Sequence, residues 1–174
     1  MKHAVSAVAE RRLGTRWSVQ VSAGAVLAGE LGLGGAHYAI SPGPFATLGG
    51  SYRAVDEKKW VPFVLVSASL GAAVSWTRQE STPSAPKETM TALDGRIGVA
   101  VGKTFAGIVS PYAVARVFGL PVLWNIDDRN VVGTDAYHYQ LGLGAALRLG
   151  DADIDVEGIP LGERAIVVGG GWSF

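Results

Sequence analysis

The sequence predicts an all-β protein whose eight strands form an antiparallel up-and-down barrel across a membrane. Three observations predict this fold. Apolar residues alternate with small or polar residues through most of the chain, which is the period of a strand with two different faces. The two long polar connections both fall on one expected side of the sheet, and the connections on the other side are short. The last strand ends in Trp172-Ser173-Phe174, which places two aromatic side chains at the end of its apolar face.

The composition restricts the class of protein. A chain of 174 residues is long enough for one domain with a core. The formal net charge is zero, so no nucleic-acid partner is expected, and the lack of cysteine excludes disulfides and thiolate chemistry. Charged residues make up 17%, below the ~25% of ordinary soluble domains, and the 24 glycines are about twice the usual share of ~7%. These proportions fit a barrel with lipid outside and crowded small residues inside.

We expect residues 1–14 to form a polar tail and residues 15–174 to form the barrel. The apolar stretch from Ala4 to Ala9 is shorter than the ~7–15 residues of a secretory signal, and the charged residues 10–12 follow it. Because a membrane barrel of this kind must be exported, we expect the chain to be a mature segment with an added Met.

Alternation begins at Thr15 and continues through two expected strands. The apolar face of the first carries Trp17, Val19, Val21, Ala23, Ala25, Leu27 and Leu31. The apolar face of the second carries Tyr38, Ile40, Pro42, Pro44, Ala46, Leu48 and Tyr52. A proline cannot donate to the hydrogen-bond ladder, so this second strand is expected to be bulged or irregular.

The segment from Trp60 to Thr77 contains no charged residue. It is almost as long as a transmembrane helix, which needs ~20 apolar residues. Its alternation favours a strand instead, because serine, glycine and threonine recur on one parity and Val, Leu and Trp on the other. Trp60 and Trp76 at the two ends of the apolar face are typical of aromatic residues at two membrane interfaces.

Two polar segments, 78–90 and 125–135, are expected to be long exposed loops. Between them lie a strand from Leu93 to Phe105 and a less regular segment, 109–124. In that segment Arg116 shares its parity with Tyr112, Val114, Phe118 and Trp124, and a charge facing lipid at mid-depth would cost about 2–4 kcal/mol. Either a bulge near residues 118–121 changes the register, or this parity does not face outward. We favour Arg116 inside.

Three more strands complete the expected barrel: Tyr137–Leu149, a weak strand at 153–157, and the terminal strand that follows a turn at 160–162. The connections expected on one side of the membrane include both long polar loops, and those on the other side are short. Outer-membrane barrels show this asymmetry. A soluble lipocalin-like barrel would also have eight strands, but it would be apolar inside and polar outside.

The alternation, the loop asymmetry and the Trp172-Ser173-Phe174 ending resemble the small eight-stranded bacterial outer-membrane barrels of the OmpX, OmpA and OmpW types. The resemblance covers residues 15–174 and identifies a class rather than one family. It implies location in a bacterial outer membrane, outer-membrane lipid as partner, recognition by the barrel-assembly machinery through the C-terminal strand, and a monomer.

Ionisable residues that are expected to face inward should form a polar network in the barrel interior, as structural pairs or as the lining of a pore. These residues are Arg16, Asp94, Arg96, Arg116, Arg148, Asp155, Glu157 and Glu163. Buried charges must pair. We therefore expect Arg148 to face Asp153 or Asp155 on the next strand, and Arg96 and Arg116 to meet Asp155 and Glu157 across the interior.

Aromatic residues on the apolar parity are expected to form the membrane-interface girdle. These residues are Trp17, Tyr38, Tyr52, Trp60, Trp76, Tyr137, Trp172 and Phe174.

The sequence favours a structural or surface-interaction barrel with a packed polar interior. A narrow pore for small solutes is the alternative, and a lipid-modifying barrel enzyme is more distant. His37 and His138 lie near the expected outer ends of their strands, but no spacing joins either to a serine, so we assign no catalytic residue. No cluster has metal-ligand spacing, and no cofactor is expected. The loops 78–90 and 125–135 are candidate adhesion surfaces.

Overall fold

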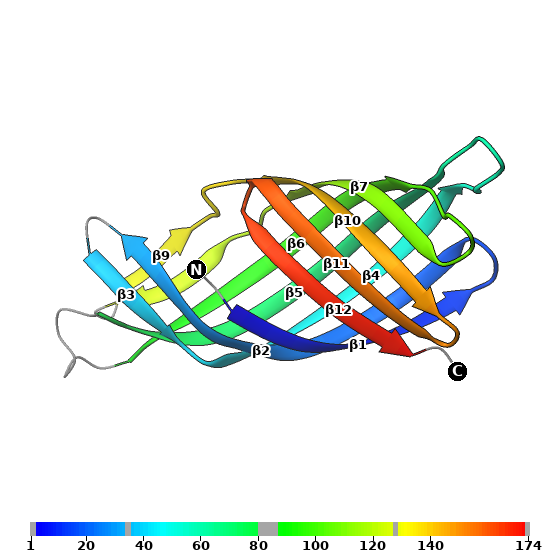
Figure 1. The fold of residues 1–174 in the computed structure, drawn as a ribbon. Coiled ribbons are helices and arrows are strands. Elements are labelled where there is room, and N and C mark those ends of the chain that lie inside the picture. Colours follow the sequence, from blue (N-terminus) through cyan, green and yellow to red (C-terminus); the bar gives the residue numbers. More distant parts are fainter. Residues whose placement is uncertain (1–2, 34–35, 80–86, 127–128, 173–174) are drawn as a thin grey trace.

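The computed structural model describes residues 3–33, 36–79, 87–126 and 129–172 (Figure 1). Within these ranges the chain forms twelve strands and no helix. The strands are β1 (His3–Leu13), β2 (Trp17–Leu33), β3 (Ala36–Ser41), β4 (Gly43–Val55), β5 (Phe63–Gln79), β6 (Glu88–Gly102), β7 (Val109–Phe118), β8 (Val122–Ile126), β9 (Arg129–Gly133), β10 (Tyr139–Leu149), β11 (Ala152–Gly162) and β12 (Ala165–Trp172).

All twelve strands belong to one antiparallel sheet that curls into a barrel-like shape (Figure 1). Neighbours follow the order β1-β2-β3-β5-β6-β7-β10-β11-β12. Strand β4 continues β3, and both strands lie between β2 and β5 and pair with each of them. Strand β8 continues β7 along β6 and pairs with β9. The predicted all-β, antiparallel and barrel-like fold is confirmed, but the described residues form twelve strands and not the eight expected, because β1 and β9 are added and two expected strands are each divided, into β3 and β4 and into β7 and β8.

The connections alternate between two ends of the sheet. We call the end with residues 14–16, 56–62, 103–108 and 150–151 the turn end. The opposite end, where Leu33, Gln79 and Ile126 end their strands and residues 163–164 connect β11 to β12, is the loop end. At the turn end the chain reverses sharply through left-handed conformations at Gly107 and Gly150, with φ of 70° and 68°.

Two expected irregular segments form strands instead. Residues 3–13, predicted to be a polar tail, are strand β1 and pair with β2 from His3 opposite Ala28 to Leu13 opposite Trp17. The valine residues of β1 suit a strand, and its charges lie close to the turn end. The predicted loop 125–135 contains most of the β8–β9 hairpin. Of the other predicted loop, residues 80–86 lie outside the described residues, and β5 and β6 occupy its ends.

The run from Trp60 to Thr77 is a strand and not a helix, as predicted. Residues 63–77 belong to β5, which pairs with β6 from Phe63 opposite Gly102 to Thr77 opposite Glu88. Leu70 and Trp76 are exposed on the outer face, whereas Ser75 and Thr77 are buried on the inner face. The alternation in the sequence therefore gives the correct facing for this strand.

The proline-containing strand is interrupted at Pro42, as predicted, and the interruption exchanges the two faces. Phe45 of β4 lies opposite Ala73 of β5, whereas Ile40 of β3 lies opposite Thr77. The residue numbers of Phe45 and Ala73 add to 118, whereas those of Ile40 and Thr77 add to 117. The register between this strand and β5 therefore shifts by one residue at Pro42. A shift of one residue turns every side chain to the other face.

An apolar cluster consequently fills the interior toward the loop end. Val26, Ile40, Met90 and Trp124 are buried, and Tyr38, Phe45 and Val122 pack against them. The rings of Tyr38 and Trp124 meet edge to face with their centroids 4.7 Å apart. The expectation that Tyr38 lies in the outer girdle is wrong, because the register shift at Pro42 turns it inward. Full burial of one such side chain contributes about 1.5–3 kcal/mol.

The inner face of β7 carries its even-numbered residues. Val114 and Phe118 are buried, and Tyr112 and Arg116 bond to side chains of β11. The placement of Arg116 inside is confirmed, and of the two alternatives left open by the sequence the second holds: this parity does not face outward. Strand β7 keeps one register along β6 and along β10, so the whole apolar parity turns inward with the arginine. The irregularity lies beyond β7, where residues 119–121 separate it from β8.

We predict that Thr77→Val lowers the free energy of unfolding by about 1–3 kcal/mol, the usual cost of an unsatisfied buried donor. The indole Nε1 of Trp124 donates to the fully buried Thr77 Oγ1 at 2.8 Å, and valine removes this acceptor. Thr77→Ser keeps the hydroxyl and serves as the matched control, with a smaller loss. Urea unfolding in detergent micelles, followed by tryptophan fluorescence, measures both. Equal losses for the two variants would contradict a role for this hydrogen bond.

Candidate functional site

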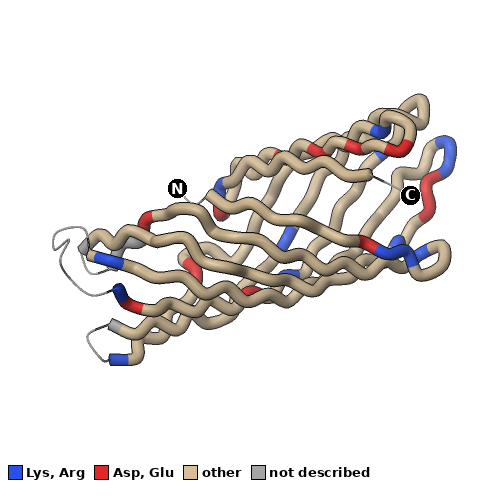
Figure 2. Tube along the Cα trace, turned by 90° about the horizontal axis from the view of Figure 1, so that it is seen from below, with Lys and Arg blue, Asp and Glu red and all other residues tan. Residues whose placement is uncertain are grey.

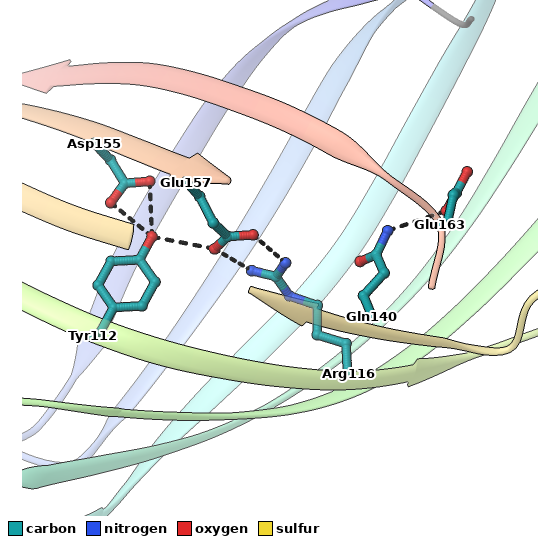
Figure 3. Close-up of polar contacts among 6 residues, drawn as sticks. All are labelled: Tyr112, Arg116, Gln140, Asp155, Glu157 and Glu163. Carbon is teal, nitrogen blue, oxygen red and sulfur yellow. Dashed lines mark hydrogen bonds and ion pairs between the residues drawn. The ribbon is translucent and has the colours of Figure 1, made fainter. Parts of the chain in front are cut away.

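The candidate site is a polar network on the inner face of β7, β10 and β11 (Figure 3). The network consists of Tyr112, Arg116, Gln140, Asp155, Glu157 and Glu163. The strand register assembles it. Gly144 of β10 lies opposite Tyr112 on one side and opposite Glu157 on the other.

Gly144 leaves room for the Tyr112 side chain to reach from β7 to β11. The Tyr112 ring passes over Gly144 to reach β11. A Cβ atom at this position would lie 2.4 Å from Tyr112 Cζ, far inside van der Waals contact. A glycine is therefore required here for Tyr112 to meet the β11 carboxylates.

Tyr112 and Arg116 hold the two carboxylates of β11. The Tyr112 hydroxyl lies 2.9 Å from Asp155 Oδ1 and 3.2 Å from Glu157 Oε2, and it can donate to one of them at a time. The Arg116 guanidinium donates to both Glu157 oxygens, with 2.8 Å between Nη2 and Oε2. The Glu157 side chain is only 5% exposed, so the ion pair compensates a carboxylate that is largely removed from water.

A second contact lies nearer the loop end. Gln140 is buried opposite Arg116, and its Nε2 donates to Glu163 Oε2 at 3.1 Å. The other side-chain atom, Gln140 Oε1, is buried and accepts no hydrogen bond within the described part of the chain. Glu163 is thus in the interior network, as predicted, but it lies in the β11–β12 connection rather than on a strand.

Asp94 and Arg96 form a separate pair on β6. Arg96 Nε lies 2.5 Å from Asp94 Oδ2, and the guanidinium stacks 5.2 Å from the centre of the Phe118 ring. Residues two apart on a strand share a face, which explains this local pair. The prediction that Arg116 meets an acid of β11 is confirmed, whereas the same prediction for Arg96 is wrong because Asp94 is nearer.

Two predicted network residues lie at the turn end. Arg16 is in the β1–β2 connection, where it pairs with Asp56 at 3.0 Å and is half exposed. Its placement in the interior network is therefore wrong. Arg148 lies directly opposite Asp153, as predicted, and both are exposed. The ion pairs found among the described residues do not include this pair.

Another polar contact at the turn end had no signal in the sequence. Glu57 Oε1 accepts from the Thr104 backbone N–H at 2.9 Å and lies 3.2 Å from Lys103 Nζ. These contacts, with the Thr104 hydrogen bond first, hold the pKa of Glu57 below its ordinary value. The contact therefore favours the folded state at neutral pH and is lost as the pH falls through the lowered pKa. It fastens the β4–β5 connection to the β6–β7 connection, two segments far apart in the sequence.

Most aromatic residues predicted for the girdle have exposed or outward positions. Trp17, Trp60 and Trp172 are exposed at the turn end, and Trp17 stacks on Tyr52 with ring centroids 4.7 Å apart. Trp76 and Tyr137 are exposed toward the loop end. Phe174 lies outside the described residues.

The described residues offer little for catalysis or metal binding. His37 and His138 are exposed, and His138 Nδ1 lies 3.3 Å from the Phe118 carbonyl oxygen. No group of three or more His, Cys, Asp and Glu side chains among the described residues is placed to hold a metal ion. Within the same ranges no helix is long and apolar enough to cross a membrane. A shallow open hollow of about 490 Å³ lies beside Pro62, Phe105 and Leu143, and few of its lining residues are polar.

Comparison with known proteins gives no relative: no family model, curated protein or solved structure matches the chain.

We predict that Glu157→Leu destabilises the protein by about 3 kcal/mol, the lower part of the range for breaking a buried pair, because Arg116 keeps some solvent contact. The double variant Arg116→Met/Glu157→Leu should recover most of this loss, since no uncompensated charge remains. Unfolding of both single variants and the double variant gives the coupling energy. Additive losses would contradict the ion pair as the centre of the network.

Proposed function

We propose that the protein is a bacterial outer-membrane β-barrel of structural or surface-interaction type, with a packed polar interior. The observation that carries this proposal is the facing of the side chains. Large apolar residues are exposed on the outer face of nearly every strand, and they include Val21, Leu48, Leu70, Ile97, Val117, Leu143, Val156 and Val168. The Asp94–Arg96 and Arg116–Glu157 ion pairs and the buried polar residues Ser75, Thr77 and Gln140 lie on the inner face of the same sheet. A soluble barrel has the reverse arrangement.

The distribution of charge supports a membrane location. Figure 2 shows the charged residues gathered mainly at the two ends of the barrel-like sheet. Between the ends, the outer face carries apolar residues, and the charges of Asp94, Arg96, Arg116 and Glu157 are turned inward and paired. An uncharged belt between two charged rims is the pattern that a bilayer requires.

The contents of the interior favour a packed barrel over a pore. The apolar cluster around Trp124 fills the interior toward the loop end, and the Arg116–Glu157 pair joins β7 to β11 over the inner face of β10 closer to the middle. A narrow pore is the second candidate function. It is favoured by small inward residues such as Gly169, where nothing lies within 4 Å of an added Cβ atom.

A projecting wall supports surface interaction. Strands β2, β3, β5, β6, β8 and β9 extend at the loop end beyond the level where β10, β11 and β12 begin or end (Figure 1). Strand β9 pairs only with β8, so the backbone N–H and C=O groups along its other edge bond to no described strand. The proposal includes outer-membrane lipid as partner, delivery by the barrel-assembly machinery through the C-terminal strand, and a monomer.

We predict that Leu70→Arg lowers the stability of the protein in phospholipid vesicles by about 2–4 kcal/mol, the cost of an arginine facing lipid at mid-depth. Leu70 is 66% exposed and lies opposite Leu48 near the middle of β5. Val55→Arg at the end of β4 is the matched control, with a cost of about 0–1 kcal/mol. Urea unfolding in vesicles measures both. A neutral Leu70→Arg would contradict lipid contact and favour a soluble barrel.

A further inference from the structure

Whether the sheet has an odd or an even number of strands decides whether its two edge strands run in the same direction. The path from β1 to β12 contains nine strands, and every pairing along it is antiparallel. With an odd number of alternating strands, the first and the last run in the same direction. Residues 15–174 alone would give eight positions, β2 to β12, whose edges run in opposite directions. Strand β1 thus changes how the barrel can close.

The edges of β1 and β12 face a common seam. In the described part of the chain β1 pairs only with β2, and β12 pairs only with β11. All eleven residues of β1 are exposed, and so are seven of the eight residues of β12. In Figure 1 the two strands come nearest to each other at the end where the C-terminus lies. In a bilayer, unpaired backbone groups along such a seam cost several kcal/mol each, so the sheet must close.

Strand β1, rather than β2, is in position to meet β12. The edge of β2 is already occupied, because β1 is in register with it from residue 3 to residue 13. Val5, Ala7 and Ala9 lie opposite the outward residues Ala25, Ala23 and Val21 of β2, so they also face outward. Ile166 and Val168 face outward on β12. Both strands end at the turn end, where Leu13 neighbours Trp17 and Trp172 neighbours Ala152.

We propose that β1 closes the barrel as a ninth strand, in a parallel pair with β12. The inference rests on the proposed membrane location, since lipid is what requires closure. Parallel pairs are slightly less stable per residue than antiparallel pairs, so this seam is the weakest line of the barrel. The inward residues beside it, Ser6 and Val8 on β1 and Gly169 and Gly171 on β12, are small enough to leave the strands free to approach.

Cysteine crosslinking tests this closure directly, because the chain has no cysteine of its own. Val168→Cys is combined in turn with Val5→Cys, Ala7→Cys and Ala9→Cys in the full chain, folded in detergent micelles and oxidised. A disulfide forms only when the two Cα atoms lie about 4.4–6.8 Å apart. We expect one of the three pairs to crosslink within one chain, with a yield comparable to that of the control pair Val156→Cys/Val168→Cys. Those two residues are direct partners in the β11–β12 register.

Three results would overturn the proposal. A crosslink between Val168→Cys and Val21→Cys or Ala23→Cys would show closure through β2 with eight strands. Crosslinked dimers would show that a second copy occupies the edge. Formation of the control disulfide alone would show an open seam. The assay reports on the seam and the Leu70→Arg comparison reports on lipid, so failure of the closure is distinguishable from failure of the membrane proposal.

Discussion

The alternation of side chains across paired strands is the constraint on which the rest of this structure depends. Once two strands are in register, the facing of one determines the facing of the other. The register of β7, β10 and β11 brings Tyr112, Arg116 and Glu157 together across Gly144. A single shift at Pro42 turns Tyr38 and Ile40 from the outer face into the apolar cluster. Both the polar network and the apolar cluster therefore follow from strand pairing.

The interior combines two ways of filling a narrow barrel. Near the loop end, Trp124, Met90 and their neighbours are buried together, and the indole N–H of Trp124 donates to the Thr77 hydroxyl oxygen. Closer to the middle, Arg116 and Glu157 satisfy each other's charge. A barrel of this size has room inside for little more than side chains. This filling is the physical basis for proposing a structural or surface-interaction role before a pore.

Much of the fold could be predicted from the sequence, because in a strand with two different faces apolar residues recur at every second position. That period located β5, β10 and β12, and the cost of a charge facing lipid placed Arg116 inside against its parity. It could not reveal the one-residue shift at Pro42, since the shift depends on pairing with β5. It also missed β1, whose alanine-rich residues lack a clear alternation and are followed by three charges. The pairing of Arg96 with Asp94 was missed because the nearer acid lay on the same strand. No sequence pattern showed the contact of Glu57 with Thr104, which joins distant connections.

The central claim is that the apolar outer face contacts lipid while the small and polar face is turned away from it. A nitroxide scan of residues 66–72 in phospholipid vesicles tests it most directly. The account predicts a period of two, with collision by molecular oxygen dissolved in lipid highest at Val66, Ala68, Leu70 and Ala72. Labels at Ser67, Ser69 and Gly71 should collide with the dissolved oxygen much less often. High collision of a water-soluble nickel chelate at the even-numbered positions would contradict the claim and identify a soluble barrel.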